Sequence, residues 1–413
     1  MPAMTECSAQ TDGAGRLQSG SCDTPVLFIA IASIAGFKII AEYGVNAITY
    51  EMDEVHDEIK EELSQTEFAC SSLSRLSGGT ANFVYRGKLT STGESIVIKH
   101  AKDYLASNKS FNLDITRCEH EIAILRALDS LPSHSKHDVT VKTPRLLYFN
   151  QKTHTQVLED LPNSLDLKTF LLSGDSGSLS ESSALAIGRA LGSWLRSLHV
   201  WAAEKGQASS EQFLRENKPM QQLKFYANYT LLVESVSSFP AILEESRGIF
   251  EQVRDLAAAE LERRDHDDEY GVIHGDFWTG NVLVQRSSLD TAEGSTNLFV
   301  VDWELSQVGA RALDLGQMIA ELYETKLFKH LDSGLQITRG FTAGYGPISD
   351  EMAFRTAIHV GVHLICWGSR VPGWGSQEQV EEVVKVGRDI IVHAWAKEKT
   401  WFEEGSLGSL FAI

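Results

Sequence analysis

The sequence predicts an α+β fold with two lobes, a small N-terminal lobe built on an antiparallel sheet and a larger, mainly helical C-terminal lobe. With 413 residues, the chain is longer than the roughly 100–200 residues of one typical domain. Short apolar segments of strand length run from Leu73 to Glu159, whereas apolar residues recur at helical spacing beyond Leu161. Strands first and helices second indicate two lobes with a cleft between them. The pattern predicts three regions, a partly disordered extension over 1–62, a small lobe over 63–160 and a large lobe over 161–413.

The N-terminal extension differs in composition from the rest of the chain. Residues 1–24 are rich in Ser, Gly, Thr and Ala, which favours disorder. The apolar run 26–37 is shorter than the about 20 residues that span a bilayer, and acidic residues outweigh basic ones ahead of it, unlike a secretory signal. We therefore expect no stable membrane span, and the role of this run stays open. Residues 51–67 form an acidic amphipathic pattern that predicts a helix.

The small lobe is predicted to contain strands and one helix. Residues 73–89 form two strand-like segments around a Gly-Gly turn, and 96–99 is a third, β-branched strand. Residues 114–128 carry Ile, Cys and Leu at helical spacing and predict a helix. Two more strands are predicted at 144–148 and 155–158.

Helices dominate the predicted large lobe. Residues 181–199 have one apolar stripe, typical of a helix that faces a core, and 244–269 predict a solvated helix followed by a loop. The stretch 304–321 is expected to run straight into a helical pattern. The Ser-, Thr- and Gly-rich stretch 287–297 is interpreted as a hairpin insertion. Short strands are predicted at 272–273, 282–284 and 299–301.

Charge and cysteine content disfavour several classes of protein. The chain has 37 Lys and Arg against 56 Asp and Glu, a net charge of −19. Because such a chain repels phosphate backbones and has no visible basic cluster, we expect no nucleic-acid partner. Its five scattered cysteines lack a CxxC pair, which disfavours a disulfide framework or a zinc ribbon and fits a reducing compartment. We therefore expect a cytoplasmic protein, and the sequence does not indicate its oligomeric state.

The strongest chemical signal is the sequence HGDFWTGN, from His274 to Asn281, between two short apolar strands. Asp302 follows a further apolar strand in VVDWE. Phosphoryl transfer requires such a set, because one carboxylate accepts the proton of the attacking hydroxyl while an amide oxygen and another carboxylate hold Mg²⁺. The alternative is that these are polar turn residues between buried strands, or a His–Asp metal hydrolase site.

Groups suited to binding a nucleotide lie upstream in the chain. Small residues in the turn SGGTAN let backbone amides approach phosphates. Lys99 ends the next strand and can pair with the α- and β-phosphates, and Glu121 on the following helix can hold it in position. Taken singly, these residues are more often features of a simple turn or of a solvated surface than of a nucleotide site. The backbone of VLEDL, with Glu159 and Leu161, is a candidate hinge for adenine. The candidate contacts in the turn are Ser77, Gly78, Gly79, Thr80 and Asn82.

The motifs together resemble the aminoglycoside phosphotransferase and choline kinase group of enzymes, over residues 73–395. They are the Gly-Gly turn, IVIK, the Glu-bearing helix, VLEDL, LGSWLRSLH, HGDFWTGN and VVDWE. The resemblance implies a bilobal, protein-kinase-like fold and transfer of the γ-phosphoryl group of ATP to a hydroxyl of a small molecule, with Mg²⁺. The roles that it implies are a catalytic base at Asp276, magnesium ligands at Asn281 and Asp302, a phosphate-binding lysine at Lys99 paired with Glu121, and support of the catalytic loop by Asp314 and His274.

Two alternatives to a small-molecule kinase remain open at this point. One is a catalytically silent pseudokinase or scaffold that binds a nucleotide. The other, less favoured, is a protein kinase, since no activation segment with an APE-like ending follows Asp302 and DWE replaces DFG.

The phosphoryl acceptor is not identified by the sequence. The acidic chain fits a small, hydroxylated and cationic acceptor, and Trp367 and Trp374 could line a pocket for one, although such residues are more often core. His359 and His363 have a spacing compatible with zinc, but a packed or solvated pair is the simpler interpretation.

Overall fold

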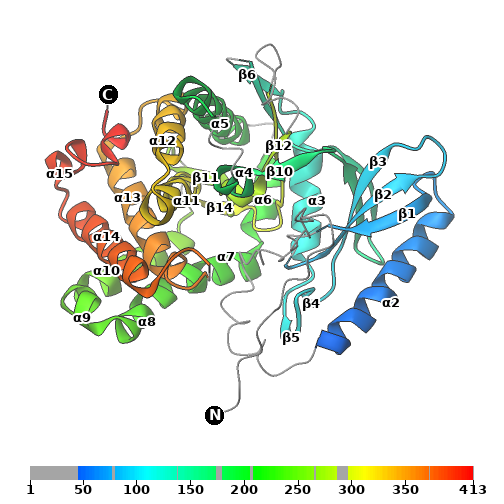
Figure 1. Ribbon diagram of the computed structural model, residues 1–413, viewed down its shortest axis with the longest axis horizontal. Coiled ribbons are helices and arrows are strands. Elements are labelled where there is room, and N and C mark those ends of the chain that lie inside the picture. Colours follow the sequence, from blue (N-terminus) through cyan, green and yellow to red (C-terminus); the bar gives the residue numbers. More distant parts are fainter. Residues whose placement is uncertain are drawn as a thin grey trace, which may run out of the picture.

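The computed structural model describes residues 45–76, 80–136, 138–173, 179–204, 208–264, 267–285, 296–371 and 373–412. A small lobe rich in strands lies beside a larger, mainly helical lobe (Figure 1), and the α+β bilobal fold expected from the sequence is confirmed. The predicted disorder of 1–24 and the apolar run 26–37 lie outside the described residues. No helix among the described residues is both long and apolar enough to cross a membrane.

The small lobe contains a five-stranded antiparallel sheet in the order β1-β2-β3-β9-β8. Each of the five corresponds to a strand that the sequence predicts. Their bounds are β1 Cys70–Arg75, β2 Phe83–Leu89, β3 Ser95–His100, β8 Leu146–Asn150 and β9 Thr155–Glu159.

Two helices cover opposite faces of this sheet, because successive side chains of a strand point to opposite sides. Ile96 and Ile98 of β3 pack into one cluster with Ile59 and Leu63 of helix α2, Val45–Ser64. On the other face, Lys99 reaches helix α3, Arg117–Leu128. Figure 1 shows α2 on the side turned away from the large lobe and α3 on the side nearer to it. The alternation along β3 therefore directs a charged side chain toward the junction of the lobes.

Helix α3 begins three residues later than the predicted 114–128. The carboxylate of Asp114 accepts hydrogen bonds from the backbone N–H and the hydroxyl of Thr116, at 2.8 and 2.6 Å. This local turn satisfies the backbone before the helix starts.

A second sheet, in the order β10-β12-β13-β7-β6, joins segments that are far apart in the sequence. β12 and β13 pair antiparallel, whereas β13 and β7 pair parallel. Most of the predicted hairpin insertion 287–297 lies outside the described residues. The β6–β7 hairpin lies before residue 160 in the sequence, yet it pairs with a strand of the large lobe. It therefore does not follow the lobe boundary predicted at residue 160, and that boundary remains a prediction. The bounds are β6 His134–Lys136, β7 Val139–Lys142, β10 Ser164–Asp166, β12 Val282–Gln285 and β13 Thr296–Val300.

The expectation that 304–321 runs straight into a helix is wrong. Strand β14, Gln307–Ala310, intervenes and pairs antiparallel with β11, Tyr270–Ile273, before helix α11 begins at Ala312. The sequence also does not predict the hairpin of β4, Tyr104–Leu105, with β5, Asn108–Asn112, the β6–β7 hairpin or strand β10.

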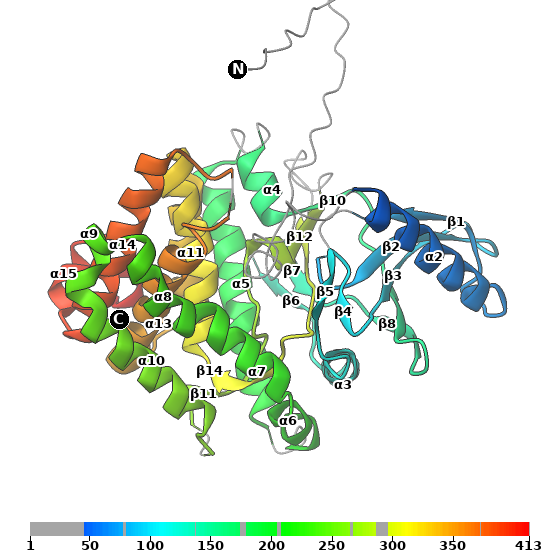
Figure 2. The same ribbon diagram turned by 90° about the horizontal axis from the view of Figure 1, so that it is seen from below.

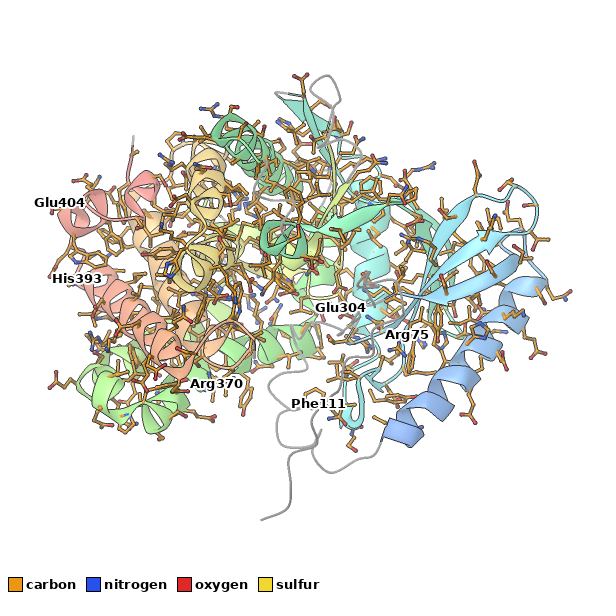
Figure 3. The ribbon with its side chains drawn as sticks, in the orientation of Figure 1. Arg75, Phe111, Glu304, Arg370, His393 and Glu404 are labelled. Atoms are coloured by element: carbon orange, nitrogen blue, oxygen red, sulfur yellow. The ribbon has the colours of Figure 1, made fainter. Side chains whose placement is uncertain are left out.

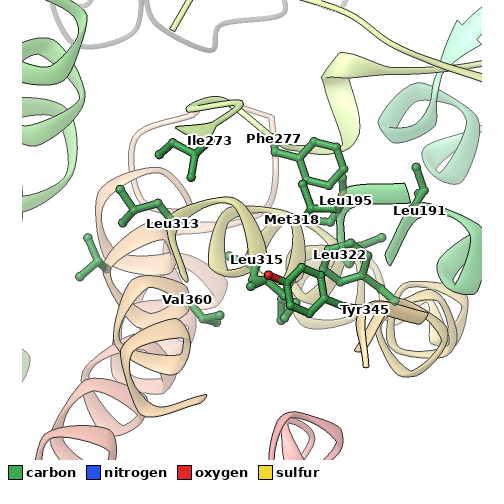
Figure 4. Close-up of a cluster of buried hydrophobic side chains, with 14 of the residues drawn as sticks. Leu191, Leu195, Ile273, Phe277, Leu313, Leu315, Met318, Leu322, Tyr345 and Val360 are labelled. Carbon is green, nitrogen blue, oxygen red and sulfur yellow. The ribbon is translucent and has the colours of Figure 1, made fainter. Parts of the chain in front are cut away.

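Helices form most of the large lobe (Figure 2), and glycines allow two of them to approach closely. A Cβ added at Gly188 or Gly192 of α5 would lie 2.1 or 2.0 Å from a backbone oxygen of α12. The core beside them contains Leu191, Phe277 and Met318 (Figure 4). The bounds are α4 Leu167–Leu172, α5 Glu181–Ala202, α6 Ala208–Arg215, α7 Lys218–Phe225, α8 Leu231–Ser238, α9 Pro240–Leu243, α10 Arg247–Leu261, α11 Ala312–Lys329, α12 Asp332–Tyr345, α13 Asp350–Cys366, α14 Gln377–Trp395 and α15 Lys399–Glu403.

Candidate active site

A cavity of about 390 Å³ lies between the lobes. Its apolar walls come from both sides, with Val84 and Val97 from the small-lobe sheet and Leu283 from β12 of the large lobe. Most of the predicted site residues line it. These are Thr80, Asn82, Lys99, Glu121, Glu159, Leu161, Asp276, Asn281 and Asp302. Ser77, Gly78 and Gly79 lie outside the described residues.

Lys99 joins two carboxylates that are distant in the sequence. Its buried ammonium donates to Glu121 Oε1 at 2.7 Å and to Asp302 Oδ1 at 2.6 Å. The other oxygen of Glu121 accepts from Gln156 Nε2 at 2.8 Å, which fixes the carboxylate on the β9 side. The lysine–glutamate pair predicted from the sequence is therefore formed, with Asp302 as an additional partner.

Lys99 and Asp302 each stabilise the charged form of the other. Burial acts to lower the pKa of Lys99, but the carboxylates of Asp302 and Glu121 outweigh it and raise that pKa. Burial acts to raise the pKa of Asp302, but the ammonium of Lys99 outweighs it and holds that pKa below its usual range. Both groups are consequently ionised at neutral pH.

Asp302 adopts a backbone conformation that is rare outside glycine. Its φ is 67°, in the left-handed region, two residues after the end of strand β13. Such strain persists only where the surroundings fix the residue, and it is commonest at functional sites. Here the bond from Lys99 holds the side chain in the cavity.

Asp276 has hydrogen-bond donors on both carboxylate oxygens. Gln317 Nε2 donates to Oδ1 at 2.7 Å, while Trp278 Nε1 and Asn281 Nδ2 donate to Oδ2 at 3.2 and 3.0 Å. Burial raises the pKa of Asp276 to about 6, against the lowering influence of Lys224 and of the Gln317 hydrogen bond. Asp276 is therefore a buried carboxylate with a pKa that suits a general base acting near neutral pH.

The loop that carries Asp276 is held by a second carboxylate. Asp314, at the start of α11, accepts from the backbone N–H groups of His274 and Gly275, at 2.8 and 3.0 Å. His274 Nε2 faces the backbone oxygen of Val301 at 3.1 Å, and its Nδ1 accepts from the N–H of Asp276 at 3.2 Å. Asp314 and His274 thus form hydrogen bonds with the backbone of this loop. Such bonds are needed if the two residues support the catalytic loop, as the resemblance implies.

Gly275 is required in this loop for two reasons. Its φ is +82°, and an added Cβ would lie 2.1 Å from the backbone oxygen of Leu305. Only glycine fits such a close approach in the left-handed region.

Asn281 lies one turn after Asp276, at the end of the short 3₁₀ segment Thr279–Asn281. Its amide nitrogen donates to the backbone oxygen and to Oδ2 of Asp276, at 2.9 and 3.0 Å. Since the nitrogen faces Asp276, the amide oxygen is the atom that can face a cation.

A buried cluster that sequence reasoning missed connects the lobes. Arg117 of α3 donates to Glu304 Oε2 at 3.0 Å and to Asn82 Oδ1 at 3.0 Å, and Asn82 Nδ2 donates to the same oxygen of Glu304 at 2.9 Å. Glu304 lies between the two lobes (Figure 3). The side chain of Asn82 is therefore engaged with protein groups, although the residue lines the cavity. The sequence singles out Asn82 only as a candidate phosphate contact and Glu304 only as the Glu of DWE, and it gives no signal for Arg117.

The predicted hinge lies at the rim of the cavity. Glu159 pairs with Lys142 at 3.0 Å and with Arg145 at 3.4 Å, and Leu161 is buried. Asp160, between them, forms a two-point ion pair with Arg86 at 2.8 and 2.9 Å. Side chains at the hinge are thus engaged with protein groups.

A second, smaller cavity of about 30 Å³ adjoins the first, and Asp276 and Trp278 line both. Its other walls include Lys168, Glu321 and His363. Lys168 pairs with Glu321 Oε2 at 2.9 Å, and His363 Nε2 contacts Glu321 Oε1 at 3.1 Å. The predicted Trp367 also lines this cavity.

The two candidate zinc histidines have different partners. His359 Nδ1 contacts the Tyr229 hydroxyl at 2.9 Å, while His363 faces Glu321. Among the described residues, potential ligand atoms of His363, Glu321 and Glu324 lie within 4.8 Å of one another, but the ammonium of Lys168 already neutralises Glu321. The packed interpretation of the histidines agrees with these contacts.

Two curated relatives are similar over most of this chain. A phosphotransferase named FrzJ, from Cladobotryum sp., is 31% identical over 376 residues, which are 87% of this chain and 97% of the relative. A 4-hydroxytryptamine kinase from Psilocybe cyanescens is 24% identical over 78% of this chain and 87% of its own length. Among solved structures, a choline/ethanolamine kinase family protein from Mesorhizobium loti aligns with 16% identity and a TM-score of 0.43, over 86% of this chain and 97% of that one.

A model of the phosphotransferase enzyme family, which includes the aminoglycoside phosphotransferases, matches residues 72–350. This range contains Lys99, the HGDFWTGN loop and Asp302. The resemblance noted in the sequence is thereby confirmed, and the chain belongs to the phosphotransferase enzyme family.

Proposed function

We propose that this phosphotransferase moves the γ-phosphoryl group of ATP, in the presence of Mg²⁺, to a hydroxyl group of a small molecule, in the cytoplasm. The observation that carries the proposal is the convergence of Lys99, Asp276, Asn281 and Asp302 on one cavity between the lobes. Phosphoryl transfer needs a cation for the phosphates, oxygen ligands for a metal and a base for the acceptor hydroxyl.

The larger cavity suits a nucleotide in size and in lining. Its volume of about 390 Å³ lies in the range of small-molecule sites. Val84, Val97 and Leu283 offer apolar walls for a planar base, and Lys99 offers an ammonium for its phosphates. Ser77, Gly78, Gly79 and Thr80 remain the proposed phosphate turn, and Glu159 with Leu161 the proposed hinge.

The donor set fits magnesium. Asp302 contributes a carboxylate whose pKa is held low by Lys99, and Asn281 contributes an amide oxygen. These are the hard oxygen ligands that Mg²⁺ prefers, and two protein ligands suffice when phosphates and waters supply the rest. When bound, the ion neutralises charge on the phosphate oxygens.

Asp276 is the proposed catalytic base. Its carboxylate lines both cavities, so it can face a nucleotide on one side and an acceptor on the other. Above about pH 6 it is ionised and can orient the acceptor hydroxyl and take its proton. Trp278, Asn281 and Gln317 hold the carboxylate in place.

The acceptor side is proposed to be the second cavity. It begins at Asp276 and leads into the helical lobe, and its 30 Å³ implies that side chains such as Trp367 must move to admit a substrate. The name of the relative from Psilocybe cyanescens supports a small hydroxylated acceptor. The net charge of −19 is compatible with a cationic one.

A screen of small hydroxylated molecules, amines included, tests the proposal by ADP formation from Mg²⁺–ATP. We expect acceptor-dependent ADP formation with the natural chain and none with Asp276→Ala, whose nucleotide binding should persist. Asp255→Ala on the exposed face of α10 is a matched control and should behave as the natural chain. Full activity of Asp276→Ala would refute the assignment of the base.

A further inference from the structure

A buried carboxylate in the large lobe has no partner for its charge. Glu324 on helix α11 is 0% exposed, and among the described residues neither of its side-chain oxygens has a hydrogen-bond partner. It is costly to bury a carboxylate without hydrogen bonds or an opposite charge. An unpaired polar group of this kind in a folded protein indicates that a proton, a water or a cation accompanies it.

Two further potential metal ligands lie beside Glu324. Glu321 comes three residues earlier on α11 and therefore lies on the same face of the helix. His363 lies on α13, and its Nε2 is 3.1 Å from Glu321 Oε1 and 4.0 Å from Glu324 Oε1. All three side chains are buried, and their potential ligand atoms lie within 4.8 Å of one another. His359 is not part of this group, because its Nδ1 contacts the hydroxyl of Tyr229.

The distances within this group suit a tetrahedral metal ion. Zn²⁺ lies about 2.0–2.2 Å from imidazole nitrogens and carboxylate oxygens, so its ligand atoms are roughly 3.3–3.6 Å apart. His363 Nε2 is slightly closer than this to Glu321 Oε1 and slightly farther from Glu324 Oε1. Small side-chain movements therefore bring all three atoms to ligand distance. One imidazole and two carboxylates are ligands that Zn²⁺ takes, whereas Mg²⁺ prefers oxygen alone.

The charges of the group leave room for such an ion. Lys168 contacts Oε2 of Glu321 at 2.9 Å, which leaves Oε1 facing His363. The ammonium of Lys168 balances one of the two carboxylates, and one negative charge remains when both are ionised. Zn²⁺ lowers the pKa of a bound water to about 7, so the ion can carry a hydroxide. An ion with two positive charges and a bound hydroxide then balances the remaining negative charge.

Water can reach this group through the second cavity. Glu321 and His363 line that cavity, and its volume of about 30 Å³ is large enough for a water molecule. Zinc sites with three protein ligands keep a fourth position for water. The cavity therefore offers both a route for the ion and the fourth ligand.

We propose that Glu321, Glu324 and His363 form a Zn²⁺ site, with a water from the second cavity as the fourth ligand. The ion connects α11 to α13 and supplies the partner that the buried carboxylate of Glu324 lacks. The site uses neither of the proposed magnesium ligands, Asn281 and Asp302, and it does not depend on phosphoryl transfer.

Calorimetric titration of the full chain with ZnCl₂, after removal of metals with EDTA and in excess Mg²⁺, tests this proposal. Glu324→Gln should weaken Zn²⁺ binding by at least on the order of tenfold, since even loss of a group behind a ligand costs about 10–100-fold. Glu398→Gln is the matched control, because it alters another Glu–His pair, formed with His393 on the surface at 2.6 Å. This control should bind Zn²⁺ as the natural chain does.

Co²⁺ in place of Zn²⁺ provides a second readout. The natural chain should show the intense visible absorption of a tetrahedral Co²⁺ ion, and His363→Gln, a second variant in case Glu324→Gln does not fold, should lose it. No Zn²⁺ binding by the natural chain, or a weak octahedral Co²⁺ spectrum, would overturn the proposal. Equal affinity in the ligand variants would mean an adventitious ion only, and would also overturn it. Absence of phosphoryl transfer would refute the proposed function alone, since neither titration involves ATP.

Discussion

The ionisation of single side chains determines what the cleft can do. Lys99 is held charged between two carboxylates, and Asp302 is held ionised by Lys99. Asp276 differs from Asp302 because burial raises its pKa to about 6. The two aspartates of the cavity thus have different pKa values. Asp302, which stays ionised, is suited to bind a cation, and Asp276 is suited to exchange a proton.

The pH dependence of turnover should report Asp276. Because its pKa in the folded protein is raised to about 6, the carboxyl is protonated below that pH and ionised above it. Turnover should therefore rise as pH increases through about 6, measured as kcat/KM for ATP-dependent phosphorylation at saturating Mg²⁺. A profile that stays flat down to the range of an ordinary aspartate, about pH 4, would contradict this account.

Replacement of Asp302 by Asn should weaken binding of Mg²⁺–ATP by at least on the order of tenfold, because a ligand charge is lost. Lys99 keeps Glu121 as a partner at 2.7 Å, so the fold should persist. Isothermal titration calorimetry measures the effect, with Asp255→Asn as the exposed control. Unchanged affinity would exclude Asp302 as a ligand.

At the scale of elements, the turns that position the site depend on backbone conformation. Gly275 has no space for a side chain and a φ of +82°. The loop is short enough that Asp276 and Asn281 stay in hydrogen-bond contact, and Asp314 at the start of α11 ties it to the helical core. These bonds join the loop to α11.

Gly275→Ala should destabilise the protein by at least about 2 kcal/mol, from strain at positive φ together with the contact to Leu305. Urea unfolding measures this. Gly248→Ala in α10 is the matched control, since nothing lies within 4 Å of its added Cβ, and it should be neutral or stabilising. Equal stability of the two variants would be inconsistent with the loop geometry.

Elements with a clear periodic pattern could be predicted from the sequence, and short ones could not. Helix α5 and strands β2, β3 and β9 have long or regular apolar patterns. Strand β14 is four residues long, and its alternation of Gln307 and Gly309 with Val308 and Ala310 is too short to be distinguished from the helical pattern that follows it. The interpretation of 304–321 as one helical pattern failed for that reason.

At the scale of the whole molecule, contacts between distant segments hold the two lobes together. Arg117, Asn82 and Glu304 form a buried cluster across the junction, and β7 pairs parallel with β13. Such pairings have no local sequence signal. The place of Lys99 and of the HGDFWTGN loop in the site could be predicted, because their spacing is local or typical of the family. The place of Arg117, Gln317 and Lys224 could be found only from the structure.

Arg117→Met should destabilise the protein by about 3–5 kcal/mol, because it leaves the buried carboxylate of Glu304 without its cationic partner. Arg254→Met, which breaks an exposed ion pair with Asp255, should cost at most about 1 kcal/mol. Thermal unfolding of the two variants compares them. A similar effect of both would show that the junction does not depend on this cluster.

The most direct test of the account separates binding from transfer within one protein. Calorimetric affinity for Mg²⁺–ATP and single-turnover transfer to an accepted hydroxyl compound would be measured side by side in the natural chain and in Asp276→Asn. The account predicts near-equal nucleotide affinity and a loss of transfer in the variant. Undiminished transfer by Asp276→Asn would contradict it.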